Sequence, residues 1–377
     1  MNSRERLLAS VRHKEPDRVP IDLGGTSSGI QTKAYDNLKK ILGFNGETKT
    51  FIRDHVEIDE SVLKILGIDT RYIRVKSPKS YKLIIEEDNS YVDLWGTRWK
   101  KPTSSFYYDM VDYPIKEPTI DALNRYKWPD PDDLGRIEGL REKARELYET
   151  TEYALVVDMI GYGVFEQGWA LRGFENFLMD LALNQKFAEA LMHRVADYKI
   201  SLWGHLLDAV GEYVQVVMEA DDMGTQQGLM VSPETYRRLI KPAQKRVWQF
   251  IKSKTKAFLF LHSCGSVRKL IPDFIELGLD ILNPVQVAAK DMDPKELKKE
   301  FGKDLTFWGG GCDTQNILPF GTPEDVGKEV KKRILELAPG GGFVFNQVHS
   351  IQPQVPPENI IRMFETAHKY GVYPIKV

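Results

Sequence analysis

From about residue 150 onward, the chain repeats one unit: a short apolar run, a turn and an amphipathic helix. The runs are rich in β-branched and aromatic residues and apolar on both faces, which is typical of buried parallel strands. Six runs are clear, at 153–159, 213–221, 257–263, 279–285, 305–311 and 342–348. Two earlier runs, 18–24 and 70–76, raise the number of expected strands to eight. Strands alternating with helices indicate parallel βαβ units, and eight of them predict an α/β fold, the closed (β/α)8 TIM barrel.

Residues 77–150 interrupt this rhythm. Within them, 81–101 alternates in the manner of a β-hairpin, with Asp88, Asn89 and Ser90 as its turn. We interpret 77–150 as an insertion that covers one mouth of the barrel. The whole chain, 1–377, is then one domain that begins with an N-terminal helical extension.

Composition restricts the classes of function. The 377 residues fit a barrel of this type, which spans about 200 to over 400 residues. The net charge of -2 provides no basic field for nucleic acid or an anionic membrane. Two cysteines are not a disulfide framework, and the charged N-terminus has no signal-peptide core. No apolar run reaches the length of a membrane span, so we expect a cytoplasmic protein.

The active site of a (β/α)8 barrel is built at the carboxyl ends of its strands. Both cysteines and two of the seven histidines follow strand ends here, together with several acids and amides. The residues at this face that we select are Glu219, Asp222, His262, Cys264, Asn283, Gln286, Cys312 and His349.

The sequence His262-Ser263-Cys264 is the sharpest local signal. Alternate residues of an extended strand point to the same side, so His262 and Cys264 can face one ion. Imidazole and thiolate are zinc donors, and a catalytic zinc takes three protein ligands and keeps a fourth position open. Cys312 is the natural third ligand and His349 the fallback. An acid, Glu219 or Asp222, could instead complete the site.

Structural roles compete with these interpretations. Cys312 could be a small buried hydrophobe, since free cysteine is among the most buried residue types. His349 could bind substrate, act as acid or base, or serve the fold. The acids from Glu219 to Asp222 could cap the next helix.

Across nearly its whole length, the chain resembles the uroporphyrinogen decarboxylase superfamily, and within it the cobalamin-dependent (corrinoid) methyltransferases. The resemblance begins in 4–22 and 53–69. It is strongest in four later segments, 229–247, 260–286, 309–326 and 343–360. It implies the barrel fold and an enzyme of one of two kinds.

Porphyrinogen decarboxylases of this superfamily use an arginine-bearing N-terminal motif to hold substrate carboxylates. The matching stretch here, 22–31, contains no arginine, which argues against that activity. The methyltransferases use a His-x-Cys…Cys zinc site, whose first two positions match His262 and Cys264. In the coenzyme M enzymes the last cysteine lies in a segment where this chain has His349. That departure argues against coenzyme M as acceptor, and the chain looks more like the first methyltransferase of O-demethylase systems.

The resemblance therefore implies a zinc-dependent methyltransferase. A methyl group would pass from an O-methyl donor, such as a methoxylated aromatic, to the Co(I) of a corrinoid (cobalamin) held by a partner protein. Zinc would stabilise the departing oxyanion, and an acid among His349, Asp222 and Glu219 could protonate it. The residues expected to contact substrate are Tyr162, Asn283, Gln286 and Trp308.

Two alternatives belong to other classes. One is a lyase of the decarboxylase type that works without metal, with Asp222 or His349 as proton donor. The other is a non-catalytic barrel that captures a corrinoid or tetrapyrrole. For the enzyme we expect a corrinoid protein and a small methyl donor as partners, with neither nucleic acid nor membrane. Assembly as a homodimer is compatible with this interpretation.

Overall fold

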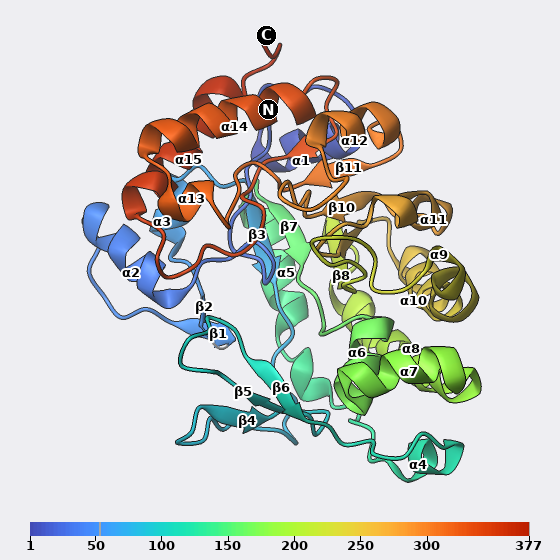
Figure 1. Ribbon diagram of the computed structural model, residues 1–377. Helices are drawn as coiled ribbons and strands as arrows, with labels where there is room; N and C mark the ends of the chain where they lie inside the picture. The colour runs from blue at the N-terminus through green and yellow to red at the C-terminus, as the bar shows by residue number, and fades with distance from the viewer. Residues whose placement is uncertain (53, 377) are drawn as a thin grey trace.

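The strands predicted from the apolar runs form one parallel sheet in the computed structural model, which describes residues 1–52 and 54–376 (Figure 1). Seven strands are hydrogen-bonded in the order β12-β11-β10-β9-β8-β7-β3, and every neighbouring pair is parallel. They are β3 (Thr70–Ile73), β7 (Ala154–Val157), β8 (Val216–Ala220), β9 (Phe258–His262), β10 (Ile281–Asn283), β11 (Thr306–Trp308) and β12 (Phe343–Val344). Seven of the eight expected strands are thereby confirmed.

The eighth predicted strand, 18–24, closes the sheet without forming a regular strand. The amide of Phe345 donates to the carbonyl of Pro20, and the amide of Asp22 donates back to Phe345, both at 2.8 Å. On its other side, the amide of Asp69 donates to Ile21 at 2.8 Å. Because Pro20 has no N–H, the ladder is interrupted there. Because this segment is hydrogen-bonded to both edges of the sheet, it closes the seven strands into an α/β TIM barrel.

Helices surround the sheet (Figure 1). Those that connect successive barrel strands from β3 onward are α5 (Leu140–Thr150), α8 (Gln185–Val210), α10 (Lys241–Lys254), α11 (Ile271–Glu276), α12 (Pro294–Phe301) and α14 (Pro323–Leu337), and α15 (Pro357–Tyr370) follows β12. The others are α1 (Ser3–Val11), α2 (Thr32–Ile41), α3 (Glu60–Ile65), α4 (Ile120–Arg125), α6 (Val164–Arg172), α7 (Phe174–Leu183), α9 (Pro233–Thr235) and α13 (Ile317–Phe320), with a π-helical turn at Tyr236–Ile240. Ser232 and Thr322 cap α9 and α14 ahead of a proline, as the Ser-Pro and Thr-Pro signals indicate.

Alternation along the strands separates two apolar layers. Val216, Met218 and Phe260 belong to a cluster inside the barrel. Leu7 and Val11 of α1 belong to the same cluster. The intervening residues pack against the helices, such as Val217 on β8. The period of two decides which side chains at the strand ends reach the mouth.

The insertion holds a three-stranded antiparallel sheet of β4 (Ser90–Val92), β5 (Arg98–Lys100) and β6 (Asp109–Asp112), beside the short pair β1 (Thr50–Ile52) and β2 (His55–Val56). The chain does turn at the predicted Asp88–Ser90, where the amide of Glu86 donates to the carbonyl of Ser90 at 2.7 Å. This turn precedes β4, however, and the hairpin turn between β4 and β5 lies at 93–97. There the Asp93 carboxylate accepts the amides of Trp95 and Thr97, each at 2.9 Å. No helix in the described part of the chain has the length and apolarity needed to cross a bilayer.

Candidate metal centre

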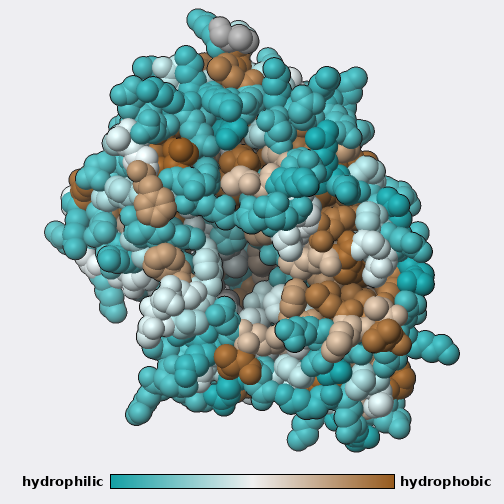
Figure 2. All heavy atoms as spheres, in the orientation of Figure 1, coloured by the Kyte–Doolittle hydropathy of each residue, from teal (hydrophilic) through white to brown (hydrophobic). Residues whose placement is uncertain are grey.

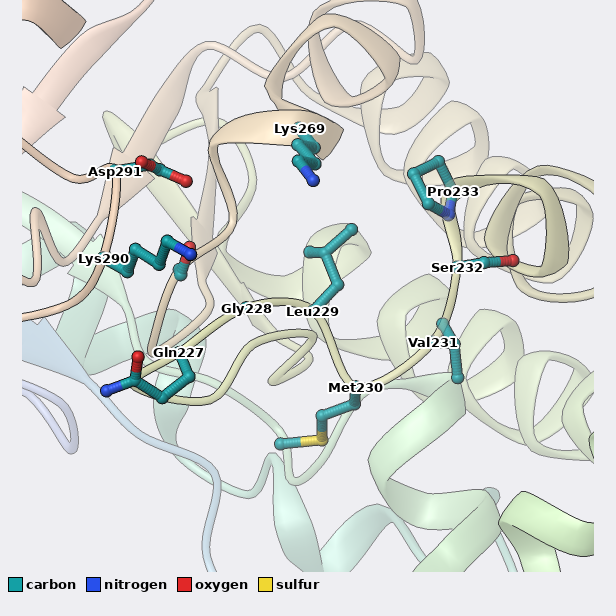
Figure 3. A pocket seen from close by; sticks show the side chains of 11 residues that line it. Gln227, Gly228, Leu229, Met230, Val231, Ser232, Pro233, Lys269, Lys290 and Asp291 are labelled. Carbon is teal, nitrogen blue, oxygen red and sulfur yellow. The ribbon is translucent and has the colours of Figure 1, made fainter.

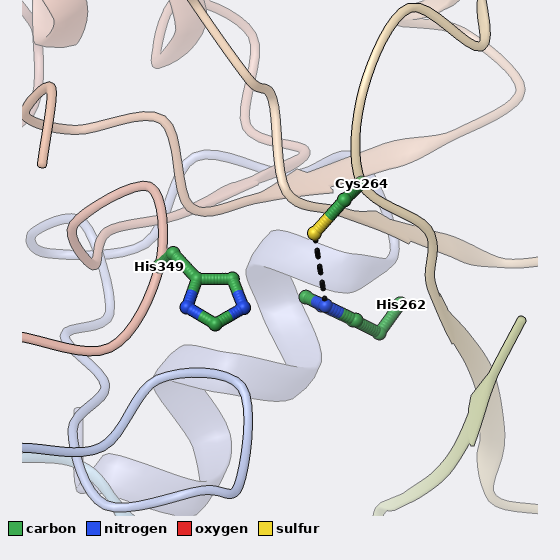
Figure 4. Close-up of side chains that lie close together, drawn as sticks. All are labelled: His262, Cys264 and His349. Atoms are coloured by element: carbon green, nitrogen blue, oxygen red, sulfur yellow. Dashed lines mark hydrogen bonds between the residues drawn. The ribbon is translucent and has the colours of Figure 1, made fainter. Parts of the chain in front are cut away.

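Three side chains converge at the carboxyl end of the barrel (Figure 4). His262 ends β9, Cys264 lies in the turn that follows it, and His349 comes from the chain after β12. One ligand atom from each lies within 4.8 Å of the other two. The Cys264 Sγ is 3.3 Å from His262 Nε2, and the two imidazole rings are 5.4 Å apart between centroids. His262 and Cys264 continue the inward series of Phe260, so strand alternation places both at the mouth.

Asn283, at the end of β10, fixes the orientation of the His262 ring. Its Nδ2 donates to the carbonyl of Trp308 at 2.8 Å, so its Oδ1 is the atom that faces His262 Nδ1 at 2.6 Å. Nδ1 must therefore carry the ring proton. That tautomer leaves the lone pair on Nε2, which points at Cys264, and this is the arrangement found behind histidine ligands of metals.

The turn that carries Cys264 is held by its neighbours. Its amide donates to Asp222 Oδ1 at 2.7 Å, and the amide of Gly265 donates to Gln286 Oε1 at 2.6 Å. Gly265 has a φ of +85°, and a β-carbon there would lie 2.5 Å from the backbone carbon of Gly224. Only glycine fits such a left-handed, crowded position. The sulfur is thus placed by a rigid turn.

The electrostatics of the cluster suit a cation. Desolvation, then the nearby Asp222 and Glu166, raises the pKa of the Cys264 thiol well above its usual value. Desolvation, then His262 and His55, lowers the pKa of His349 to about 3, so this imidazole is neutral. The buried Nδ1 of His349 has no hydrogen-bond partner among the described residues. The neutral imidazole of His349 with its unsatisfied ring nitrogen, the imidazole of His262 and a thiol beside carboxyl groups fit a divalent metal, which would stabilise the thiolate.

Glu166, which sequence reasoning missed, lies in this environment. It is buried in the first turn of α6, whose start is held by Asp221: the Asp221 carboxylate accepts the Phe165 and Glu166 amides at 3.2 and 2.9 Å. Desolvation, then the proximity of Asp222 and Asp221, raises the pKa of Glu166 well above its usual value. The available signal was an acid within a helix that is apolar on all sides, since such residues are rarely buried without a function.

Cys312, the first choice for third ligand, does not join the cluster. It is fully buried in the layer between sheet and helices, with its Sγ 3.6 Å from Glu329 Oε2 on α14. Gly309 and Gly310 have φ values of +91° and +80°, which redirect the chain after β11. His349, the fallback, stands with the pair instead.

Glu219 is likewise not at the mouth. It belongs to the outward series of β8, with Val217, and its carboxylate accepts Trp203 Nε1 at 2.6 Å and pairs with Lys199 at 3.1 Å. Both partners lie on α8. Strand alternation directs the Glu219 side chain away from the mouth, so the structure does not place it where a catalytic residue was expected.

The structure places the four residues expected to contact substrate in different surroundings. The side chains of Asn283 and Gln286 form hydrogen bonds within the protein, to His262 and to the amide of Gly265. Trp308 is fully buried inside the barrel, where its Nε1 donates to Asp22 Oδ2 at 2.9 Å, so it is part of the interior packing and not a wall of the site. Tyr162 is half-buried between Trp99 of the insertion and Trp169 of α6, with ring centroids 5.9 and 6.0 Å away.

The insertion reaches the cluster through Tyr107. Its ring lies 6.4 Å from that of His349, and its hydroxyl accepts from Gln352 Nε2 at 3.0 Å. A second contact joins Lys101 to Asp54 at 2.5 Å. These contacts place the three-stranded sheet beside one side of the mouth.

The chain is similar to known methyltransferases and decarboxylases. The sequence model of the uroporphyrinogen decarboxylase family matches residues 111–370. A methylated-thiol–coenzyme M methyltransferase of Methanosarcina mazei is 25% identical over 59% of this chain and 57% of its own length. A uroporphyrinogen decarboxylase of Staphylococcus aureus is 26% identical over 50% of this chain and 53% of its own length. The chain thus aligns with somewhat over half the length of these curated relatives.

A solved methyltransferase from Methanosarcina mazei shares the fold. The two structures superpose with a TM-score of 0.68 at 18% identity, over 98% of this chain and 99% of that one. The match extends over the insertion and the N-terminal segment as well as the barrel.

Proposed function

Since the chain belongs to the uroporphyrinogen decarboxylase family, whose model matches well over half of it, we propose that it is a zinc-dependent methyltransferase. It would move a methyl group from an O-methyl donor, such as a methoxylated aromatic, to the Co(I) of a corrinoid held by a partner protein. The observation that carries the proposal is the convergence of His262, Cys264 and His349 within 4.8 Å. We further propose that residues 77–150 cover one side of the mouth within a single domain.

The mouth of this barrel does not suit the decarboxylase alternative. Residues 22–31 contain no arginine, and the arginine that reaches this stretch, Arg74, donates to the Gly24 carbonyl. Its Nε is paired at 3.0 Å with Asp158, which is 2% exposed. A guanidinium already neutralised by a buried carboxylate is a poor partner for a substrate with many carboxylates.

The ligand set explains the choice of zinc and of an oxygen donor. Two imidazoles and one thiolate are a zinc set with room for a fourth ligand. With a single thiolate the centre keeps one net positive charge, whereas two thiolates would cancel it. When bound, zinc supplies Lewis acidity that stabilises negative charge on the donor oxygen as its bond to the methyl carbon breaks. The negative charge that develops on an ether oxygen would be stabilised more by this positively charged centre than by a centre with two thiolates.

The residues of the chain have positioning roles in this proposal. Asn283 fixes the tautomer of His262, and Asp222 holds the amide of Cys264. The half-buried aromatic group around Tyr162 lies near the mouth and suits an aromatic donor. Co(I) provides the electron pair for the new bond to the methyl carbon, so the protein has to align the two reactants and exclude water.

Metal analysis combined with product analysis tests the proposal. The purified protein should contain about one zinc, and it should methylate free cob(I)alamin from a methoxylated aromatic while releasing the phenol. Removal of zinc by a chelator should abolish transfer, and readdition should restore it. Full transfer by the zinc-free protein would contradict the proposal, and release of carbon dioxide without cobalamin would favour the lyase.

A further inference from the structure

One half of the rim around the mouth is open and chemically distinct. The loops that follow β8, β9 and β10 enclose a pocket of about 330 Å³ (Figure 3). Its walls are residues 227–233, Ser266 and Lys269, and Lys290 with Asp291. Ser266, in the wall of the pocket, follows Cys264 by two residues in the chain, and the pocket lies at the same carboxyl end of the strands as the candidate metal centre.

The pocket has an excess of positive charge. Lys269 and Lys290 are exposed, and neither side chain has an ion-pair or hydrogen-bond partner among the described residues. Other lysines of the same barrel segment are paired, for example Lys241 with Asp273 at 2.9 Å and Lys252 with Asp280 at 2.8 Å. Asp291 offers the only opposing charge in the pocket wall. Two cations without partners favour an acidic ligand surface.

Apolar side chains are exposed on α7 as well. After β7 the chain forms α6 and α7 before it enters the long α8, and α7 exposes Phe174, Met179 and Leu183 by 40%, 53% and 86%. The pocket adds Leu229, Met230 and Val231, which are half-buried. Figure 2 shows apolar surface gathered beside the central hollow, in the region of α6 and α7. A patch of this kind on the rim of a site marks a surface for a protein partner.

The other half of the rim is already covered. Tyr107 packs against His349, and Gln352 donates to the Tyr107 hydroxyl. Lys101 ties the same insertion to Asp54. The insertion also contacts the segment after β7, where Trp99 packs against Tyr162. A partner that must reach the metal centre therefore approaches over the loops that follow β8, β9 and β10.

We infer that the surface made by the loops that follow β8, β9 and β10, together with the exposed apolar side chains of α7, is the docking face for the protein that carries the corrinoid; we call it the rim. The inference rests on the proposed methyl transfer. A methyl group held next to His262 and Cys264 can reach cobalt only if the carrier protein presses against the mouth. The rim selects a carrier whose own contact surface is acidic around an apolar centre, with carboxylates opposite Lys269 and Lys290 and apolar side chains opposite Met179 and Leu183.

Two acceptors separate docking from chemistry. One is free cob(I)alamin, and the other is a corrinoid protein, reconstituted with cobalamin, that the wild-type enzyme methylates. The double variant Lys269→Glu/Lys290→Glu should raise the KM for the corrinoid protein about tenfold or more at low salt, with the rate on free cob(I)alamin unchanged. Met179→Glu/Leu183→Glu should have the same pattern. The control is Lys256→Glu/Lys303→Glu, which makes the same charge change in exposed loops before β9 and β11, at the opposite end of the barrel.

The salt dependence of the same assay provides a second measurement. The wild-type KM for the corrinoid protein should rise with ionic strength, and this dependence should flatten in the lysine variant. An unchanged KM in both rim variants would overturn the docking face while leaving methyl transfer intact. Equal losses with free cob(I)alamin would also overturn it, because the residues would then act on the chemistry. If the wild type fails to methylate even free cob(I)alamin, the proposed function itself is wrong and the docking face falls with it.

Discussion

Asn283 holds His262 in the tautomer whose Nε2 is free to bind a metal beside Cys264, through an Nδ1–Oδ1 contact of 2.6 Å in the interior of the barrel mouth. The amide has no freedom to turn over, because its Nδ2 is committed to the Trp308 carbonyl. A residue of the neighbouring strand, β10, thus determines whether the β9 histidine is a ligand. A substitution of Asn283 therefore tests the candidate metal centre without changing any of its three candidate ligands.

Asn283→Leu should weaken zinc binding by about 10- to 100-fold, because the ring of His262 loses the acceptor that fixes its proton on Nδ1. Asn283→Asp keeps an acceptor opposite Nδ1 and should retain most of the affinity. The measurement is competition for zinc with a chromophoric chelator, on variants whose fold has been checked by circular dichroism. Equal affinities for the leucine and aspartate variants would show that the contact does not tune the metal.

His349→Ala should remove zinc from the purified protein, whereas Cys312→Ala should keep it. The first variant removes one of the three converging candidate ligands, and the second changes a side chain that faces Glu329 in the helical layer. Loss of the buried sulfur should lower the free energy of unfolding by about 1 kcal/mol. Metal content by mass spectrometry and unfolding in urea separate the two effects. A zinc-free Cys312→Ala protein with normal stability would restore Cys312 as the third ligand.

Gly265→Ala should destabilise the protein by about 1–3 kcal/mol and reduce zinc binding as well. The φ of +85° and the close backbone of Gly224 leave no space for a β-carbon, so the turn that carries Cys264 has to move. Gly228→Ala is the matched control in the neighbouring loop, because its β-carbon would meet nothing within 4 Å. Urea unfolding and zinc affinity are measured on both. Tight zinc binding by the Gly265 variant would mean that the turn does not need its present shape.

The architecture could be predicted from sequence because buried parallel strands leave an unmistakable apolar signature. Only the stretch around Ile21 escaped regular strand geometry, since a proline precedes it and its hydrogen bonds are divided between two neighbours. His262 and Cys264 were also predictable, because local alternation alone places both on one side of the chain. Residues two positions apart along a strand point to the same side, and this can be predicted without knowledge of the rest of the fold.

The third residue of the candidate metal centre and the positions of the acids could not be predicted in this way. Cys312 turns away because two consecutive glycines take positive φ values, and the sequence does not say in which direction such a turn leads. Glu219 and Asp222 are close in sequence, yet strand alternation sends the first to α8 and leaves the second at the mouth. Glu166 comes to the site from a helix after β7, a contact distant in sequence that no local pattern indicates.

Lys199→Met should destabilise the fold strongly. Lys199 is 3% exposed and lies 3.1 Å from the buried Glu219, so its removal leaves a carboxylate without its cation in the layer behind β8. Breaking a buried pair from one side costs about 3–5 kcal/mol, and protonation of Glu219 would recover part of that cost at low pH. Burial already raises the pKa of Glu219, while Lys199 opposes the rise, so the variant should be less destabilised at pH 5 than at pH 8. Adding Glu219→Gln to the variant should recover stability at pH 8. Glu219→Gln alone should leave kcat per folded molecule unchanged. A large fall in kcat for Glu219→Gln alone, in a protein that is fully folded and zinc-loaded, would return this carboxylate to the catalytic site.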